Sequence, residues 1–283
     1  MQRQVQPELL DELSPADPRA LASRADLRRL NTWRANGRLA ADALISAFGN
    51  KAPSRIVELG AGDGNFLWSL GRRLGARWPR LSVVMVDRQS VVEPQTLTAL
   101  GRLGWRPQVV VTDVFDWFRQ SSQYDDDALV ANLFLHHLAS EQLGELLRRS
   151  AGVARVFVAV EPRRSKWAFL CSRLVGLAGC SAVTRHDAPV SVRAGFTGRE
   201  LSRLWPRDEN WELHETAAGL FSHLFVARRR IGIRDPKSET PHLLKSPETQ
   251  ATGKTAMAET RSFSTSIFAI PSAFGLRNSD FLR

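Results

Sequence analysis

Short apolar runs alternate with amphipathic segments between Ser54 and about Arg229. The first five runs are RIVELG at 55–60, LSVVMVD at 81–87, QVVVTD at 108–113, ALVANLF at 128–134 and RVFVAVE at 155–161. Strands and helices in regular alternation are typical of βαβ units, so these runs predict a parallel sheet. Two later runs, WELHET at 211–216 and FSHLFVARR at 221–229, are separated only by AAGL, which is too short for a helical crossover. They predict an antiparallel hairpin at one edge of a Rossmann-like, doubly wound α/β sheet of seven strands.

The regions on either side of this alternation have different patterns. Residues 18–48 place leucines at helical spacing around a break at Asn36-Gly37, which predicts two helices. Beyond Ile231 the chain loses all sustained periodicity and becomes rich in Ser, Thr, Lys and Pro. The sequence therefore predicts an N-terminal helical cap at 1–50, a main domain at 51–230 and a disordered or loosely attached tail at 231–283.

The composition fits one sizeable core, because 43% of the 283 residues are hydrophobic. The formal net charge of +10 raises the question of a nucleic-acid partner. However, only five of the 39 basic residues are Lys, the arginines are scattered, and no block of five or six like charges occurs. A codon-composition bias explains that pattern equally well, so charge alone does not establish a nucleic-acid partner.

The cysteines and the first residues indicate the compartment. Cys171 and Cys180 stand nine apart in an apolar segment, which suits buried thiols and provides neither a disulfide framework nor a four-ligand metal site. The first fifteen residues lack the apolar core of a signal peptide, and no apolar run reaches the roughly 18 residues that span a bilayer. We expect a reduced, cytoplasmic protein without a metal centre.

The stretch VELGAGDGN carries the most specific chemistry. Its glycines, Gly60, Gly62 and Gly64, follow the first strand, where missing side chains let a ligand approach the backbone at a helix N-terminus. The dinucleotide fingerprint requires a glycine where this chain has Asn65, which weakens a dehydrogenase interpretation. Glu58 would repel a pyrophosphate, whereas it would attract the cationic end of a ligand.

This stretch resembles the first motif of class I S-adenosylmethionine-dependent methyltransferases, and the later strands resemble that family in order. The resemblance implies that Asp87, which ends the second strand, holds the ribose hydroxyls of S-adenosylmethionine. It implies that Asp113 lies near the adenine amino group, with Val114 and Phe115 beside the ring. It also implies a backbone carbonyl of Asn132 or Leu133 near the methionine amino group.

Structural roles remain open for the same residues. The resemblance covers about residues 55–229. An acid that ends a strand is often only a helix cap, and this structural role is open for Asp87 and Asp113. Glycines at a βα turn can serve tight packing alone. Asn31, Trp33 and Arg34 could lie over the methionine end of the cofactor or belong to the core.

The fourth strand is followed by NLFLHHL, which bears on the methyl acceptor. Enzymes that methylate base amino groups commonly carry two prolines here, and this chain has none. A histidine suits an oxygen acceptor, because an imidazole of pKa about 6.5 can take the proton of a phenol as transfer proceeds. His137, or failing it His136, is therefore the candidate base, although either histidine could instead cap the next helix or pack.

The insertion at 162–204 should cover the acceptor. Its segment at 165–182 is apolar around most of a helix, which indicates either a buried helix or contact with a lipid-like acceptor or a membrane surface. His186, beside Asp187, is a further candidate base, although Asp187 could instead pair with Arg185 and leave His186 without a role.

Four segments of the chain, RLNTWRANGR, NLFLHHL, EPRRSKWAFLCSRLVG and TRHDAPVSVRAGFTGREL, are together similar to methyltransferases that accompany bacterial type III polyketide synthases and act on phenolic lipids. That resemblance implies O-methylation of a small, apolar, phenolic acceptor. The alternatives are an RNA methyltransferase, which the basic charge favours, and a non-catalytic scaffold that binds S-adenosylmethionine. The sequence leaves the oligomeric state open.

Overall fold

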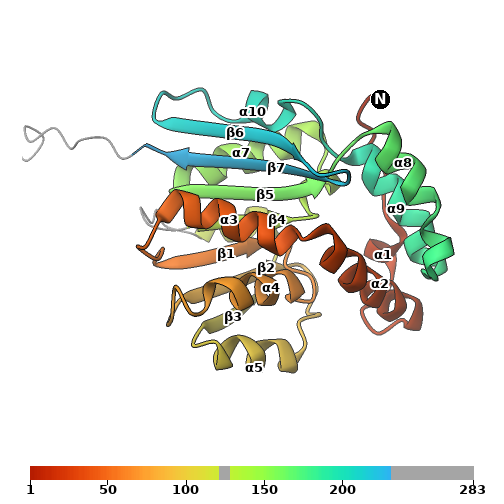
Figure 1. The fold of residues 1–283 in the computed structure, drawn as a ribbon, viewed down its shortest axis with the longest axis horizontal. Coiled ribbons are helices and arrows are strands. Elements are labelled where there is room, and N and C mark those ends of the chain that lie inside the picture. The colour runs from red at the N-terminus through yellow and green to blue at the C-terminus, as the bar shows by residue number, and fades with distance from the viewer. Residues whose placement is uncertain (121–127, 231–283) are drawn as a thin grey trace, which may run out of the picture. The chain divides into compact units, whose positions relative to one another are not determined.

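The computed structural model describes residues 1–120 and 128–230, with only the backbone described at 31–34 (Figure 1). Its seven-stranded sheet has the order β3-β2-β1-β4-β5-β7-β6, and the predicted α/β fold is confirmed. The strands are β1 (Arg55–Leu59), β2 (Ser82–Asp87), β3 (Arg106–Val111), β4 (Ala128–Asn132), β5 (Val156–Pro162), β6 (Trp211–Ala218) and β7 (Ser222–Arg229). The first five are parallel, and β7 pairs antiparallel with both β5 and β6, as the short AAGL connection predicts.

The central strands are buried on both faces, which explains why their sequences are continuous apolar runs rather than alternating ones. Every residue of β4 and β5 is buried, whereas in β6, at the edge, only Trp211 is buried and the other residues are exposed or partly buried. Four crossover helices each connect one parallel strand to the next: α4 (Asn65–Leu74), α5 (Pro94–Arg102), α6 (Val114–Gln120) and α7 (Ser140–Val153). Within the described residues, no helix is long and apolar enough to cross a bilayer.

Two helices precede the sheet, α2 (Pro18–Arg34) and α3 (Asn36–Phe48), after a short α1 (Leu9–Glu12) that the pattern did not predict. The break between them falls at Ala35, one residue before the expected site, where φ is +52°. Gly37 then permits close packing of α3 on α4, because a Cβ there would lie 2.3 Å from Ser69 Oγ. Helix α3 packs directly on the sheet, with Leu44 in one hydrophobic cluster with Ile56.

The second hydrophobic cluster contains an aromatic group that attaches the edge hairpin. Trp205 is 2% exposed, and its ring centroid lies 5.4 Å from that of Phe157, 5.0 Å from that of Trp211 and 5.5 Å from that of Phe225. These distances suit edge and tilted aromatic contacts. The group holds β6 and β7 against the parallel part of the sheet.

The chain between β5 and β6 forms four short elements in place of the single apolar helix expected at its start. They are α8 (Lys166–Arg173), η2 (Val175–Ala178), α9 (Ala182–Ala194) and α10 (Glu200–Leu204). In Figure 1, α8 and α9 lie beside α1 and α2 at the carboxyl ends of the parallel strands. Of the two free cysteines, Cys180 is buried, as expected, and Cys171 is half-buried. The predicted tail at 231–283 lies outside the described residues.

Candidate active site

A cavity of about 810 Å³ opens at the carboxyl ends of the parallel strands. It lies where the strand order reverses between β1 and β4, the position at which open α/β sheets bind ligands. Its wall combines the loops after β1, β2, β3 and β4 with the N-terminal segment, α2 and α9. Most of the sequence-predicted site residues therefore line one cavity.

The glycine loop presents bare backbone to this cavity. Gly60, Gly62 and Gly64 have φ values of +69°, +54° and +74°, which L-residues rarely adopt. A Cβ at Gly60 would lie 2.2 Å from the ring of Phe134, so this glycine serves packing. A Cβ at Gly62 would meet no atom within 4 Å, and Gly62 lines the cavity. A side chain at Gly62 would occupy ligand space, whereas at position 60 the close approach of the Phe134 ring requires glycine.

Asp87 stands at the end of β2 with its carboxylate fixed by main-chain donors. Its Oδ2 accepts from the Gly62 N–H at 2.8 Å, and its Oδ1 accepts from the Gln89 N–H at 2.8 Å. Each carboxylate oxygen keeps a second lone pair, so Asp87 can still accept hydrogen bonds from ligand hydroxyls. The side chain is held in place before any ligand arrives.

Asp113 combines the two roles that the sequence left open. Its Oδ1 accepts from the Phe115 N–H at 2.8 Å, and its carbonyl accepts from the Trp117 N–H, so it caps α6. Asp113, Val114 and Phe115 also line the cavity. Capping therefore does not remove Asp113 from the site.

Glu58 is a buried carboxyl, and one of its oxygens lacks a hydrogen-bond partner among the described residues. The residue is 1% exposed, lines the cavity, and its Oε2 has no hydrogen-bond partner among the described residues. Burial, reinforced by the charges of Asp63 and Asp87, raises the pKa of Glu58 well above its ordinary value. A cationic ligand group beside Oε2 would supply the missing partner and restore the carboxylate.

The end of β4 is fixed by a chain of buried amides. Asn132 Oδ1 accepts from Asn36 Nδ2 at 2.8 Å, and Asn36 Oδ1 accepts from the Ser222 hydroxyl at 2.9 Å. Leu133 follows with φ of +53°, and both Asn132 and Leu133 line the cavity. Sequence reasoning missed Asn36 and Ser222, since it treated Asn36 only as a helix break.

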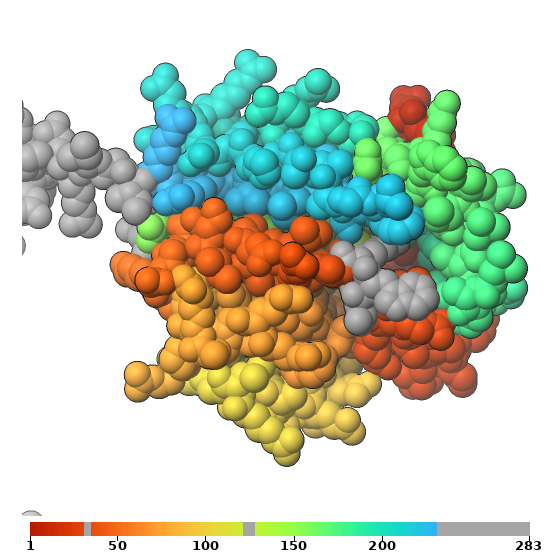
Figure 2. Space-filling view, viewed as in Figure 1, coloured from red at the N-terminus to blue at the C-terminus, as the bar shows by residue number. Residues whose placement is uncertain are grey.

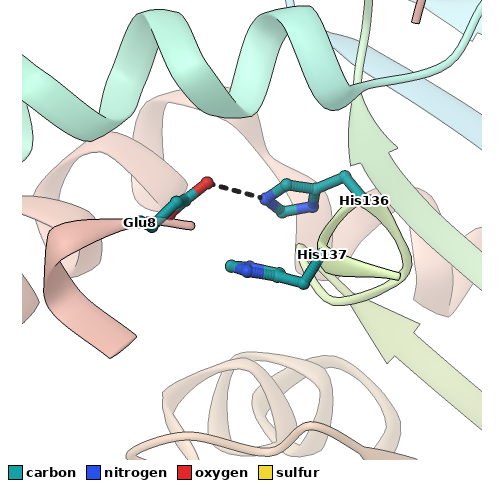
Figure 3. A group of neighbouring side chains, drawn as sticks. All are labelled: Glu8, His136 and His137. Atoms are coloured by element: carbon teal, nitrogen blue, oxygen red, sulfur yellow. Dashed lines mark ion pairs between the residues drawn. The ribbon is translucent and has the colours of Figure 1, made fainter. Parts of the chain in front are cut away.

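His136 lies between the carboxylates of Glu8 and Glu161, and Figure 3 shows the contact with Glu8. Its Nδ1 is 2.8 Å from Glu161 Oε2 and its Nε2 is 3.3 Å from Glu8 Oε1. Burial alone would lower the pKa of His136, but hydrogen bonds and charge from Glu161 and Glu8 outweigh it and raise that pKa to about 9. Burial would raise the pKa of Glu8, and the contacts with His136 bring it down to about 2. His136 is therefore an imidazolium at neutral pH.

Glu161 also shapes the turn that carries both histidines. Besides binding His136, its carboxylate accepts from the N–H groups of Phe134 at 3.0 Å and Leu135 at 2.8 Å. The 3-10 helix η1 (Leu135–His137) is held in this way to the end of β5. Glu161 ends the apolar run at 155–161, and nothing in that run predicts these contacts.

His137 differs from its neighbour in exposure and contacts. Its side chain is 26% exposed and lines the cavity, and its Nδ1 lies 3.0 Å from Asp11 Oδ2. Its ring centroid is 4.1 Å from that of His136, with the planes 40° apart. Its exposure to the cavity is what a base must have to meet an acceptor.

Glu8, His136 and His137 could also be considered as metal ligands, because each offers an atom within 4.8 Å of the others. Both ring nitrogens of His136 are, however, already engaged with carboxylates. A metal ion would have to displace the proton from its Nε2. The geometry is that of an ion-paired cluster.

Sequence reasoning missed the N-terminal segment, which closes one side of the cavity. Arg3 donates to the carbonyls of Leu138 at 2.8 Å and Ala194 at 2.9 Å. Asp187 accepts from the N–H groups of Leu9 at 2.9 Å and Leu10 at 3.0 Å. No periodicity marks residues 1–8, so the pattern gave no signal for these contacts.

His186 is placed differently from the other two histidines. Its Nδ1 lies 2.8 Å from Asp187 Oδ1, and its side chain is 51% exposed. Asp187 lines the cavity, but His186 is not among the described residues that do. The side chains of Asn31, Trp33 and Arg34 lie outside the described part of the chain.

Comparison with known proteins agrees with this architecture. No protein-family model and no curated protein matches the chain. An O-methyltransferase family protein from Burkholderia thailandensis matches with a TM-score of 0.53 at 18% identity, over 77% of this chain and 61% of that protein's length. The plantazolicin methyltransferase BpumL, in complex with a monoazolic desmethylPZN analog and SAH, matches with a TM-score of 0.53 at 16% identity, over 76% and 92%. The chain has the Rossmann-like fold of methyltransferases.

Proposed function

We propose that this chain is a methyltransferase that uses S-adenosylmethionine and methylates an oxygen atom of a small, apolar, phenolic acceptor. The observation that carries the proposal is one cavity that joins an open glycine loop, a fixed Asp87 and a buried Glu58 whose Oε2 bonds to none of the described residues. That set suits a ligand with hydroxyl groups and a cationic end. A protein of the same fold, BpumL, is described in complex with SAH, the product form of this cofactor.

The residues of this chain fit that cofactor at four positions. Asp87 would accept hydrogen bonds from the ribose hydroxyls, and Glu58 would face the cationic end of the methionine. Asp113 and Val114 would border the adenine. A main-chain carbonyl at Asn132 or Leu133 would accept from the amino group. When bound, S-adenosylmethionine supplies a methyl group activated by a sulfonium.

The protein's part in the chemistry is to orient the acceptor and remove its proton. His137 is the proposed base, because it borders the cavity and because His136 already holds its proton between two carboxylates. His136 would keep the η1 turn rigid. His186 remains the second candidate, through its contact with Asp187.

The cavity wall near His137 supports the proposed class of acceptor. Val5, Leu10 and Leu138 line the same cavity and are apolar, while His137 and Gln142 are polar. A hydroxyl on an apolar ring would satisfy both kinds of surface. The cavity volume lies within the range of small-molecule sites, with room for a cofactor and a compact acceptor.

Calorimetry with the purified protein tests the cofactor site. Asp87→Ala is expected to weaken S-adenosylmethionine by about 2 kcal/mol, roughly 30-fold, since charge-assisted contacts are lost. Asp42→Ala is the matched control, because Asp42 carries the same charge on α3, is 62% exposed and does not line the cavity. Unchanged affinity in Asp87→Ala, or comparable binding of NADH, would contradict the assignment.

Transfer of a radiolabelled methyl group tests the acceptor. The label should enter simple phenols and a bacterial lipid extract, and it should not enter total RNA. Label in RNA, together with an affinity for RNA that falls steeply with salt, would instead support an RNA methyltransferase. Cofactor binding without transfer to any of the three would support a scaffold.

A further inference from the structure

The surface formed by α8 and η2 exposes a compact apolar face. Trp167, Leu170, Leu174 and Leu177 are 70%, 50%, 49% and 87% exposed. Their spacing of three, four and three residues keeps them on one side of the helical path, while Ala168 on the other side is buried. We call these four residues the α8–η2 face. If this segment were a core helix, these four apolar side chains would be buried rather than exposed.

Positive charge surrounds this face. Lys166, Arg173 and Arg185 are exposed, and the chain has no Asp or Glu from residue 162 to 186. The Arg185 side chain lies against η2, because a Cβ at Gly176 would be 2.8 Å from Arg185 Cδ. Asp26 of α2 accepts from the Ser181 N–H at 2.7 Å near this face, but it is buried and paired with Arg29.

An anionic lipid surface fits this combination best. Tryptophan favours the boundary between headgroups and acyl chains, leucines enter the apolar layer, and Lys and Arg reach anionic headgroups. A second copy of this chain would bring the same positive rim against itself, which is unfavourable. The charge complementarity therefore selects the membrane as the occupant.

The α8–η2 face is one helix away from the cavity. Helix α9 packs against α8, with the Arg193 guanidinium 4.6 Å from the centre of the Phe169 ring. Helix α9 also contributes Thr184, Asp187 and Ser191 to the cavity wall. In Figure 2, α8 forms part of the outer surface at this end of the protein.

We propose that the α8–η2 face docks the protein reversibly on anionic phospholipid. Docking by itself depends only on the exposed side chains. Its use, which rests on the proposed function, is to bring the acceptor side of the cavity to a surface where apolar phenols accumulate. With four apolar side chains and no spanning helix in the described residues, binding should be weak and salt-dependent.

Vesicle sedimentation of the full chain, without cofactor or acceptor, tests the proposal. Binding to phosphatidylcholine vesicles containing about one quarter phosphatidylglycerol should exceed binding to pure phosphatidylcholine about tenfold, and should fall with added salt. Trp167→Ala combined with Leu177→Ala should lower the partition coefficient at least about fivefold. Leu220→Ala is the control, because Leu220 is 63% exposed in the β6–β7 turn.

Two results would overturn docking. One is equal partition of the wild type and the Trp167/Leu177 double variant with an unchanged melting curve. The other is a wild-type dimer, measured by light scattering, that dissociates in the double variant while neither protein binds vesicles. The double variant should still methylate a water-soluble phenol. Vesicle binding without any methyl transfer would leave docking standing and refute the proposed function instead.

Discussion

The ion-paired His136 should make the protein less stable as the pH rises from 6.5 to above 9. In the folded chain its pKa is raised to about 9, against an ordinary value of 6.5. Below pH 6.5 both the folded and the unfolded chain bind this proton, so the stabilisation is fully present. Between pH 6.5 and 9 only the folded chain keeps it, and the stabilisation is lost progressively.

The size of the effect follows from the same two values. One pKa unit corresponds to about 1.4 kcal/mol, so a rise from 6.5 to about 9 contributes about 3 kcal/mol to the free energy of unfolding. Glu8, with its pKa lowered from 4.5 to about 2, reports the same ion pair from the acid side. The contribution of Glu8 disappears as the pH falls below 4.5. It is not added to the contribution of His136, because both pKa values describe the same ion pair.

Urea unfolding followed by tryptophan fluorescence, at several pH values between 6 and 10, measures this loss. The comparison is a variant with Glu8→Gln and Glu161→Gln, which keeps the side-chain shapes and removes both charges that face His136. In that variant the decline in stability between pH 6.5 and 9 should largely vanish. Glu145→Gln, at an exposed acid of α7 paired with Arg148 and Arg149, is the control and should retain the decline.

The reasoning would be refuted by a wild-type stability that stays level across this range. It would equally be refuted by a double variant that declines as steeply as the wild type. Lower overall stability of the variant does not affect the test, because the slope with pH is the quantity compared.

Four further outcomes are expected. His137→Ala should lower kcat by about 10² to 10⁴ with cofactor affinity nearly unchanged, measured by steady-state kinetics and calorimetry, and a full rate would make His186 the leading base candidate. Gly62→Val should abolish cofactor binding in calorimetry, because its side chain would fill ligand space in a strained backbone. Dialysis against a chelator should leave the methylation rate unchanged, since His136 is engaged by carboxylates. Removing residues 231–283 should leave the melting temperature and cofactor affinity intact, and a large drop would show that the tail belongs to the fold.

The sheet and the cofactor side of the cavity could be predicted because their signals are local. Buried parallel strands are continuous apolar runs, and the glycines after β1 occupy alternate backbone positions with positive φ. Asp87 ends β2 and Asp113 follows shortly after β3, so sheet topology alone brings them to one edge. Asp113 caps α6 and borders the cavity with the same carboxylate, which is why the sequence could not separate its two roles.

The acceptor side could not be predicted, because its contacts join distant parts of the chain without a repeating pattern. Glu8 meets His136, and Asp187 meets the N–H groups of Leu9 and Leu10, through single polar side chains in otherwise ordinary segments. For the apolar stretch at 165–182, the sequence alone did not decide between burial and exposure. Its break into α8 and η2 turns Leu177 outward, which helical periodicity alone does not reveal.

The bonds of Arg3 set an order in which the two halves of the site can form. Arg3 and Ala194 are 191 residues apart, so during synthesis Arg3 must wait for most of the sheet to emerge. The glycine loop and Asp87 are separated by only 25 residues and can meet much earlier. In a nascent chain, the cofactor side of the cavity could therefore form well before the acceptor side. In the folded protein, local opening of the N-terminal segment would expose the acceptor side and leave the cofactor side intact.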